Sequence, residues 1–127
     1  MKPVLMKLYL FLLVTSFISC AQTENPPSMS VQELRNEMKE NSNLIILDVR
    51  TPQELAGPLG HIDGVINIPV QELGRRINEL EKFKDKDIAV ICRTGNRSTY
   101  GTELLIKHGF KARNVLGGMT EYRSSEN

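Results

Sequence analysis

The pattern of hydrophobic positions changes after the first twenty residues of the chain. Residues 8–18 form a short, nearly unbroken apolar run, which follows a start with two lysines and no acidic residue. From residue 30 onward, short aliphatic runs alternate with segments in which apolar residues recur every three or four positions. The first pattern is typical of an export signal, and the second indicates a domain built from alternating strands and helices.

Two predicted helices begin at capping boxes. Ser30 and Glu33 have the spacing of a capping box at the start of a helix that ends near residue 41. Thr51 and Glu54 repeat this spacing at a shorter helix, with Pro52 at its first position. The spacing of apolar residues predicts two further helices, at 73–80 and at 98–108.

Short aliphatic runs predict strands at 44–49, 65–68, 88–91 and 115–116. The first and third runs do not alternate with polar residues, which is typical of strands buried on both faces. Strands separated by helices imply an α/β fold with a parallel sheet covered on both faces. Ligands of such sheets bind beyond the carboxyl ends of the strands, so the residues after Ile91 are candidates for function.

Composition and charge exclude several classes of protein. The 127 residues suffice for one modest domain. The formal net charge of +1 gives no indication of a basic surface that would bind nucleic acid. Two cysteines cannot form a disulfide framework, and two histidines offer little to a metal site. Without residues 1–19, which hold Lys2 and Lys7, the 16 basic residues become 14 against 15 acidic ones, a net charge of −1.

Residues 1–20 are interpreted as a signal peptide of the lipoprotein type, with Cys20 as the lipidation site. The apolar run is too short to cross a bilayer, which takes about 20 residues. Ordinary cleavage after Ala21 and a buried N-terminal core helix are the alternatives. The polar, proline-containing residues 21–29 predict a flexible linker, and residues 30–127 the domain. We therefore expect an exported protein of the periplasm or cell envelope, in contact with the membrane only through a lipid anchor.

The strongest candidate for chemistry is the segment Cys92-Arg93-Thr94-Gly95-Asn96-Arg97-Ser98, between a predicted buried strand and a helix. No proline interrupts it, and Gly95 permits the positive φ that curls backbone N–H groups into an anion-binding nest. The following helix N-terminus and the two arginines favour negative charge at the sulfur. These features predict a lowered thiol pKa and a nucleophilic thiolate. The alternative is a small buried cysteine in a turn.

Four segments in order resemble motifs of one known family: 48–54 (DVRTPQE), 60–69 (GHIDGVINIP), the Cys92 loop (residues 92–98) and 115–119 (VLGGM). Over roughly residues 30–123 the chain resembles a single-domain rhodanese, of the sulfurtransferase family. The resemblance implies a three-layer α/β domain with a central, mostly parallel sheet of about five strands and helices on both faces.

The same resemblance assigns roles to individual residues. It implies that Cys92 carries a persulfide stabilised by the N–H groups of its loop, residues Arg93, Thr94, Gly95, Asn96, Arg97 and Ser98. It gives Asp48 and Arg50 an architectural role beside this loop, with Asp48 expected to pair with an arginine of the loop.

Loop length favours a sulfur substrate over a phosphate ester. Arg97 is five places after Cys92, whereas phosphatases that resemble this architecture carry the arginine six places after the cysteine. We expect Cys92 to take a sulfane sulfur from thiosulfate or a related donor and pass it to a thiol or cyanide. Arg93 and Arg97 would offset charge on the donor and the persulfide. This reaction uses no metal or organic cofactor.

A hypothesis of a different class is an exported persulfide-carrier or redox-sensing module with little turnover of its own. Once Cys20 is lipidated or removed, Cys92 is the single thiol, with no intramolecular partner in an oxidising compartment. An exported thiol-protein partner would then serve it. An inactive scaffold is the third hypothesis, and the intact cysteine argues against it.

The two histidines receive structural interpretations. His61 lies in a Gly-His-Ile context that resembles a structural turn of the family, which favours a hydrogen-bonding scaffold over a general base. His108 ends a predicted helix, where a cation suits the helix dipole. A metal site made of Cys92, His61 and His108 would lack ligands and short ligand spacing.

The chain departs from the family pattern in places outside the Cys92 loop. Residues 55–59 (LAGPL) are about two residues longer than the common form, so the rim of the crevice is expected to differ. Val65 replaces the usual alanine, and Tyr122 the usual tryptophan. The position of Asn127 leaves little room for a terminal helix.

Overall fold

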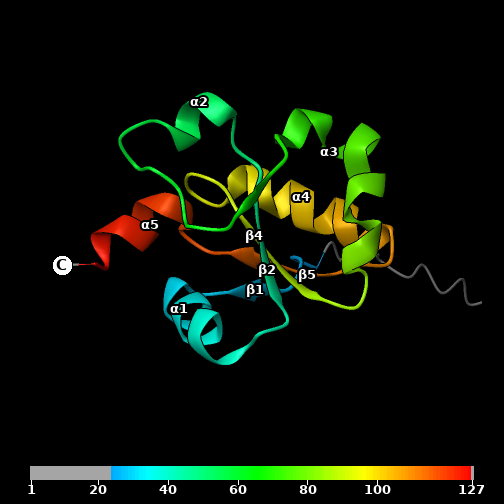
Figure 1. Cartoon of the computed structure of the whole chain (residues 1–127), viewed down its shortest axis with the longest axis horizontal. Coiled ribbons are helices and arrows are strands. Elements are labelled where there is room, and N and C mark those ends of the chain that lie inside the picture. The colour runs from blue at the N-terminus through cyan, green and yellow to red at the C-terminus, as the bar shows by residue number, and fades with distance from the viewer. Residues whose placement is uncertain (1–23, 127) are drawn as a thin grey trace, which may run out of the picture.

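Residues 24–126 are described by the computed structural model, in which helices cover a five-stranded sheet (Figure 1). All four pairings between neighbouring strands are parallel. The order across the sheet is β1 (Ser28–Met29), β5 (Lys111–Val115), β4 (Asp87–Ile91), β2 (Leu44–Asp48) and β3 (Ile66–Asn67). The predicted three-layer α/β fold is therefore confirmed. The predicted signal peptide and Cys20 lie outside the described residues.

Helices pack on both faces of the sheet. One apolar cluster joins the sheet to α1 (Val31–Glu40) and α5 (Gly118–Ser124). The other joins it to α3 (Val70–Arg76), the 3₁₀ helix η1 (Ile77–Phe83) and α4 (Asn96–Lys107). Along β4 the buried side chains alternate between the two clusters, and Cys92 extends the series on the α4 side. No helix among residues 24–126 is long and apolar enough to cross a bilayer.

The two helix starts predicted from capping boxes are confirmed by reciprocal hydrogen bonds, whereas α3 and α4 begin at Val70 and Asn96, before the predicted residues 73 and 98. Ser30 Oγ accepts from the Glu33 N–H at 3.1 Å, and Glu33 accepts from the Ser30 N–H. Thr51 and Glu54 form the same box at α2 (Pro52–Leu55). At the other end of α4, His108 is the C-cap residue and its Nδ1 lies 2.8 Å from the Leu104 carbonyl oxygen, as its structural interpretation expects.

The predicted linker is wrong at its last two residues. Ser28 and Met29 form strand β1, which pairs with Asn114 and Val115 of β5. The Met29 side chain is 1% exposed and belongs to the core. A two-residue strand gives almost no periodic signal, and the polar residues before it concealed its start.

Three other elements differ from their predictions. The helix expected through residues 73–80 changes from α-helix to 3₁₀ helix at Ile77. Strand β5 begins at Lys111, earlier than the predicted 115–116. The expectation of little terminal helix is wrong, because α5 spans Gly118–Ser124 and buries Met119 and Tyr122. The Tyr122 ring, at the position where the resemblance implies a tryptophan, stacks under the Arg35 guanidinium at 3.9 Å.

Candidate active site

Cys92 lies at the carboxyl end of β4, where the chain turns into α4. Its side chain is 1% exposed, and its Sγ accepts a hydrogen bond from the Gly95 N–H at 3.1 Å. The Ser98 Oγ lies 3.2 Å from the same sulfur. Gly95 adopts φ +109°, a left-handed conformation that favours glycine, and it is the N-cap residue of the twelve-residue helix α4. The sulfur is thus enclosed by the first turn of a helix, as the sequence predicts.

The surroundings of Cys92 act on its pKa in opposite directions. Burial raises the pKa, because a thiolate loses hydration in the interior. Hydrogen bonds from the Ser98 side chain and from the backbone N–H groups of Ser98, Gly95 and Thr94 lower it. The hydrogen bonds outweigh burial, so the pKa of the Cys92 thiol lies below its ordinary value. This direction favours the thiolate that a nucleophilic role requires.

The helix α5, absent from the sequence prediction, fixes the backbone of the Cys92 loop from the other side. The N–H of Met119 donates to the Cys92 carbonyl at 2.8 Å, and the N–H of Thr120 to the Arg93 carbonyl at 3.0 Å. Gly118, at φ +55°, makes this approach possible, because a Cβ there would lie 2.5 Å from the Cys92 carbonyl oxygen. The Gly117-Gly118 pair therefore allows the start of α5 to hold the loop.

The polar side chains of the Cys92 loop divide into outward and inward groups. Arg93, Thr94 and Asn96 are exposed, whereas Arg97 is partly buried and Ser98 is fully buried. Only Ser98 therefore brings a polar side chain to the sulfur, and the exposed side chains are free to meet a substrate.

Arg97 is bound to Glu54, a partner that sequence reasoning missed. The guanidinium donates to both carboxylate oxygens of Glu54, at 2.7 and 2.8 Å. This pairing is the main cause that lowers the pKa of Glu54 to about 2, and burial opposes it. Arg97 lies close enough to Cys92 for their charges to interact, but Glu54 balances its charge. The expectation that Arg97 offsets charge on the donor and the persulfide did not include this carboxylate partner, while Arg93 has no ion pair within residues 24–126.

Asp48 and Arg50 form a buried ion pair behind the site. Arg50 Nη2 lies 2.7 Å from Asp48 Oδ2, and the two side chains are 1% and 0% exposed. The expectation that Asp48 pairs with an arginine of the Cys92 loop is wrong, since the partner comes from its own segment. Arg50 also donates to the carbonyls of Glu54 at 3.4 Å and Gly60 at 2.8 Å. It thereby ties together the two ends of the longer segment 55–59, which is an architectural role.

His61 is an exposed residue that follows segment 55–59. Its Nδ1 lies 3.3 Å from the Leu55 carbonyl oxygen, and its own carbonyl accepts from Arg123 at 3.2 Å. Both contacts connect backbone segments, in keeping with the scaffold interpretation. Within residues 24–126, no group of three or more His, Cys, Asp or Glu side chains is arranged to hold a metal ion.

Sequence reasoning also missed a buried polar residue on β5. Asn114 is 4% exposed, and its Oδ1 accepts from Ser98 Oγ at 2.6 Å. Its Nδ2 donates to Thr99 Oγ1 at 3.0 Å. The only hint in this segment was the asparagine directly before Val115, because a polar side chain in a buried strand requires hydrogen-bond partners.

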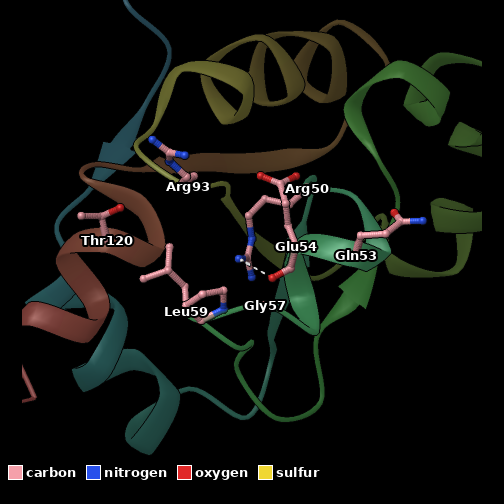
Figure 2. Close-up of a pocket in the computed structure, with 8 residues that line it drawn as sticks. Arg50, Gln53, Glu54, Gly57, Leu59, Arg93 and Thr120 are labelled. Carbon is pink, nitrogen blue, oxygen red and sulfur yellow. Dashed lines mark hydrogen bonds between the residues drawn. The ribbon is translucent and has the colours of Figure 1, made fainter.

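A cavity of about 510 Å³ opens beside the Cys92 loop (Figure 2). Arg93 and Thr120 lie on one side of it, and Arg50 and Glu54 on another. Gly57, Pro58 and Leu59 supply an apolar wall, so part of the longer segment 55–59 lines the cavity. Gln53 completes the lining. The cavity is much larger than a small inorganic donor and has room for an organic acceptor.

Comparison with known proteins identifies the family to which this chain is similar. The model of the Rhodanese-like domain matches residues 30–125. The chain is 35% identical over 97 residues to the "Putative sulfur carrier protein YrkF" of Bacillus subtilis, and 33% identical over 91 residues to the "Putative sulfurtransferase YtwF" of the same organism. These alignments cover 76% and 72% of this chain, and 50% and 84% of the relatives. The chain thus spans only half of YrkF.

A solved structure shows the same likeness in three dimensions. A rhodanese-related protein from Thermoplasma volcanium superposes with a TM-score of 0.70 at 36% identity, over 78% of this chain and 92% of that one. The family match covers strands β2 to β5, the residues that line the cavity and the whole Cys92 loop. Other relatives, such as YtwF, are named as sulfurtransferases. This chain therefore belongs to the rhodanese-like domain family.

Proposed function

We propose that the chain is a sulfurtransferase that moves a sulfane sulfur from thiosulfate or a related donor, through a Cys92 persulfide, to a thiol or cyanide. The observation that carries the proposal is the enclosure of one cysteine sulfur at a strand end by the Gly95 N–H and the Ser98 hydroxyl. The Gly95 N–H stabilises negative charge on sulfur, and so does the Ser98 hydroxyl when its proton points to the sulfur; both steps of the reaction require this stabilisation. Sulfurtransferase relatives of similar length, such as YtwF, agree with it.

The reaction has two displacement steps. The Cys92 thiolate attacks the outer sulfur of thiosulfate and forms a new S–S bond. The S–S bond within thiosulfate breaks, and sulfite leaves with its electron pair. The thiolate of the acceptor then attacks the outer sulfur of the Cys92 persulfide. Cys92 leaves as a thiolate, and the acceptor carries the sulfur away as its own persulfide, or as thiocyanate when the acceptor is cyanide.

Arg93 is the residue we expect to recruit the anionic donor. It is exposed, lines the cavity and follows Cys92 directly, and no ion pair balances its charge within residues 24–126. The two other arginines of the site, Arg50 and Arg97, are paired with carboxylates. The apolar wall of Gly57, Pro58 and Leu59 suits the organic part of a thiol acceptor.

A donor and acceptor screen with matched variants tests this function. Cys92→Ser should abolish sulfite release from thiosulfate, and turnover that survives this change would refute the persulfide mechanism. Arg93→Gln should raise the KM for thiosulfate several-fold with little change in kcat. Lys107→Gln removes the same charge at the far end of α4 and should leave KM unchanged. Equal effects of the two charge removals would refute the role of Arg93.

A carrier with little turnover of its own is the second candidate. It is favoured by the likeness to YrkF and by the 1% exposure of Cys92, which limits the approach of acceptors. Intact mass after thiosulfate treatment separates the two. A persulfide that passes readily to small thiols indicates an enzyme, and a persulfide that passes only to one exported thiol protein indicates a carrier.

Export and lipid anchoring at Cys20 form a separate part of the proposal. Their support is the basic start, the apolar run of residues 8–18 and the cysteine that follows it. Labelling of expressing cells with a fatty-acid analogue should mark the wild type and leave Cys20→Ser unmarked. An unlabelled wild type would exclude the anchor.

A further inference from the structure

A chain of buried hydrogen bonds begins at the Cys92 sulfur and returns to the same loop. Ser98 Oγ lies 3.2 Å from the sulfur and 2.6 Å from Asn114 Oδ1. The amide of Asn114 continues to Thr99 Oγ1 at 3.0 Å, and Thr99 Oγ1 to the Gly95 carbonyl at 2.7 Å. The chain crosses from β4 to α4 and β5, and the Gly95 N–H closes it on the sulfur at 3.1 Å.

The direction of these hydrogen bonds follows from their last member. The Gly95 carbonyl can only accept, so the single hydroxyl proton of Thr99 points to it. Thr99 Oγ1 must then accept from Asn114, which places the NH₂ group of the amide toward Thr99. The amide oxygen consequently faces Ser98 and accepts the Ser98 proton.

Because the Ser98 proton points to Asn114, Ser98 Oγ presents only its lone pairs to the sulfur. A neutral Cys92 thiol fits the arrangement, because its S–H can donate to Ser98 Oγ. A thiolate or persulfide anion needs a hydroxyl that donates to it, because the anion can only accept hydrogen bonds. Ser98 has one proton, so it must withdraw that proton from Asn114 before it can donate to the sulfur anion.

The network can make this change at a small cost in free energy because the Asn114 side chain is an amide, with both a donor and an acceptor group. If Asn114 turns its NH₂ group toward Ser98, its oxygen can accept the Thr99 hydroxyl proton. The Gly95 carbonyl then keeps the backbone N–H of Thr99, which donates to it at 3.1 Å. Every buried polar group retains a partner in both settings, and only a side chain with one donor edge and one acceptor edge permits both.

We propose that Asn114 is a positioning residue that acts through the Ser98 hydroxyl, and that its amide sets whether the Cys92 site holds a neutral thiol or a sulfur anion. The inference rests on the proposed function only in taking Cys92 as the reactive group. Asn114 itself does not contact the sulfur in this network; its neighbour Ser98 does.

Charged groups around Cys92 come from several elements and stay constant in the test. Arg97 on α4 interacts with the Cys92 charge and is balanced by Glu54 on α2. The Asp48–Arg50 pair lies at the carboxyl end of β2, and Arg93 belongs to the loop itself. None of them is bonded to Asn114, so substitutions there act on the hydrogen-bond chain and leave these ion pairs in place.

The test measures the rate at which iodoacetamide alkylates Cys92 across pH, in the full chain with Cys20→Ser so that one thiol remains. Asn114→Asp presents only acceptor oxygens, holds the Ser98 proton and adds a negative charge. It should lower the rate at pH 7 at least tenfold, with recovery to within twofold at pH 10. Asn114→Leu has a similar size but no polar edge, so it frees Ser98 to donate. It should raise the rate at pH 6 at least twofold.

Further variants separate the hydrogen-bond chain from direct charge and from packing. Ser98→Ala should slow alkylation at pH 6, and adding Asn114→Leu to it should have no further effect. Thr102→Val removes an equally buried hydroxyl, which bonds the Ser98 carbonyl and lies outside the chain, and should change the rate less than twofold. Asn114→Val replaces the leucine variant if the latter does not fold.

Two results would overturn the inference. The first is a shift of the rate in the same direction by the aspartate and the leucine (or valine) variants. The second is an unchanged leucine or valine effect in the Ser98→Ala background. Because no sulfur donor is present in this assay, its failure is distinct from a failure of the proposed sulfurtransferase activity, which the thiosulfate screen tests.

Discussion

Replacing Glu54 with glutamine tests the ion pair that joins α2 to the helix of the Cys92 loop. The carboxylate has a pKa of about 2, against an ordinary value of 4.5, mainly because Arg97 donates two hydrogen bonds to it. A shift of this size corresponds to at most about 3 kcal/mol of stability. The two side chains are 31% and 32% exposed, and solvent screening reduces the expected loss in Glu54→Gln to about 1–2 kcal/mol at pH 7.

The pH dependence of this loss has a definite sign. The folded pKa of Glu54 is lower than the unfolded one, so unfolding binds a proton between pH 4.5 and about 2. The stabilisation is complete above pH 4.5 and disappears as the pH falls toward 2. Glutamine keeps an oxygen for the capping bond to the Thr51 N–H, so the loss of charge is what the variant reports.

Urea titrations followed by circular dichroism, at pH 7 and pH 3.5, measure the effect. The free energy of unfolding of Glu54→Gln should fall below that of wild type at pH 7, and by a smaller margin at pH 3.5. Glu79→Gln, which breaks the more exposed pair with Arg76, is the matched control and should cost much less. The reasoning is refuted if Glu54→Gln costs no more than this control, or if its cost is the same at both pH values.

Two further predictions concern the architecture that holds the site. Gly118→Ala should destabilise by more than about 3 kcal/mol in urea titrations, because a Cβ would lie 2.5 Å from a carbonyl of the Cys92 loop. Gly64→Ala, at φ +80° with open space around it, should cost only about 1–2 kcal/mol, and equal costs would contradict the packing argument. Asp48→Asn should cost about 3–5 kcal/mol, because it leaves the buried Arg50 charge without its partner. Glu72→Gln, in a pair on the surface of α3, should lose far less, and a similar loss would show that burial does not set the cost.

Most of the fold and the Cys92 loop could be predicted because their signals are local in sequence. The capping boxes at Ser30 and Thr51 involve residues three positions apart. The aliphatic runs of β2 and β4 are buried on both faces and therefore lack the alternation of a surface strand. The Cys92 loop has its glycine and its nucleophile within seven consecutive residues. This short segment therefore contains nearly all the groups that surround the sulfur.

The partners of the site could not be predicted because they join distant segments. Glu54 and Arg97 are 43 residues apart, and Ser98 and Asn114 are 16 apart. Periodicity shows which face of an element is apolar, and it contains no information about which polar side chains meet across elements. Glu54 was accounted for by its capping role alone, and in the structure it caps α2 and binds Arg97 at once.

The short strand β1 was missed for a related reason, and its place bears on the site. Residue 27 accepts from the Asn114 N–H through its carbonyl at 2.8 Å, and Ser28 pairs with Asn114 in the sheet. The backbone of the residue that directs Ser98 is therefore held by a segment that the sequence marked as a linker. Sequence polarity alone gave no sign that this segment enters the core.

Local charge at the site is smaller than its arginine content implies, and this limits how an anion is held there. The site holds three arginines, Arg93 and Arg97 in the Cys92 loop and Arg50 after β2, yet Asp48 balances Arg50 and Glu54 balances Arg97. A free thiolate or persulfide therefore gains its stabilisation chiefly from hydrogen bonds: the Gly95 N–H, which needs no reorganisation when charge forms, and the Ser98 hydroxyl, which donates to the sulfur once it releases Asn114. Arg93 is left to act on the incoming anion at the cavity, at the surface where charge is screened. Binding of the donor and stabilisation of the sulfur anion are thus assigned to different groups, so Arg93→Gln should act on KM for thiosulfate, while changes at Ser98 and Asn114 should act on the pH dependence of the thiol.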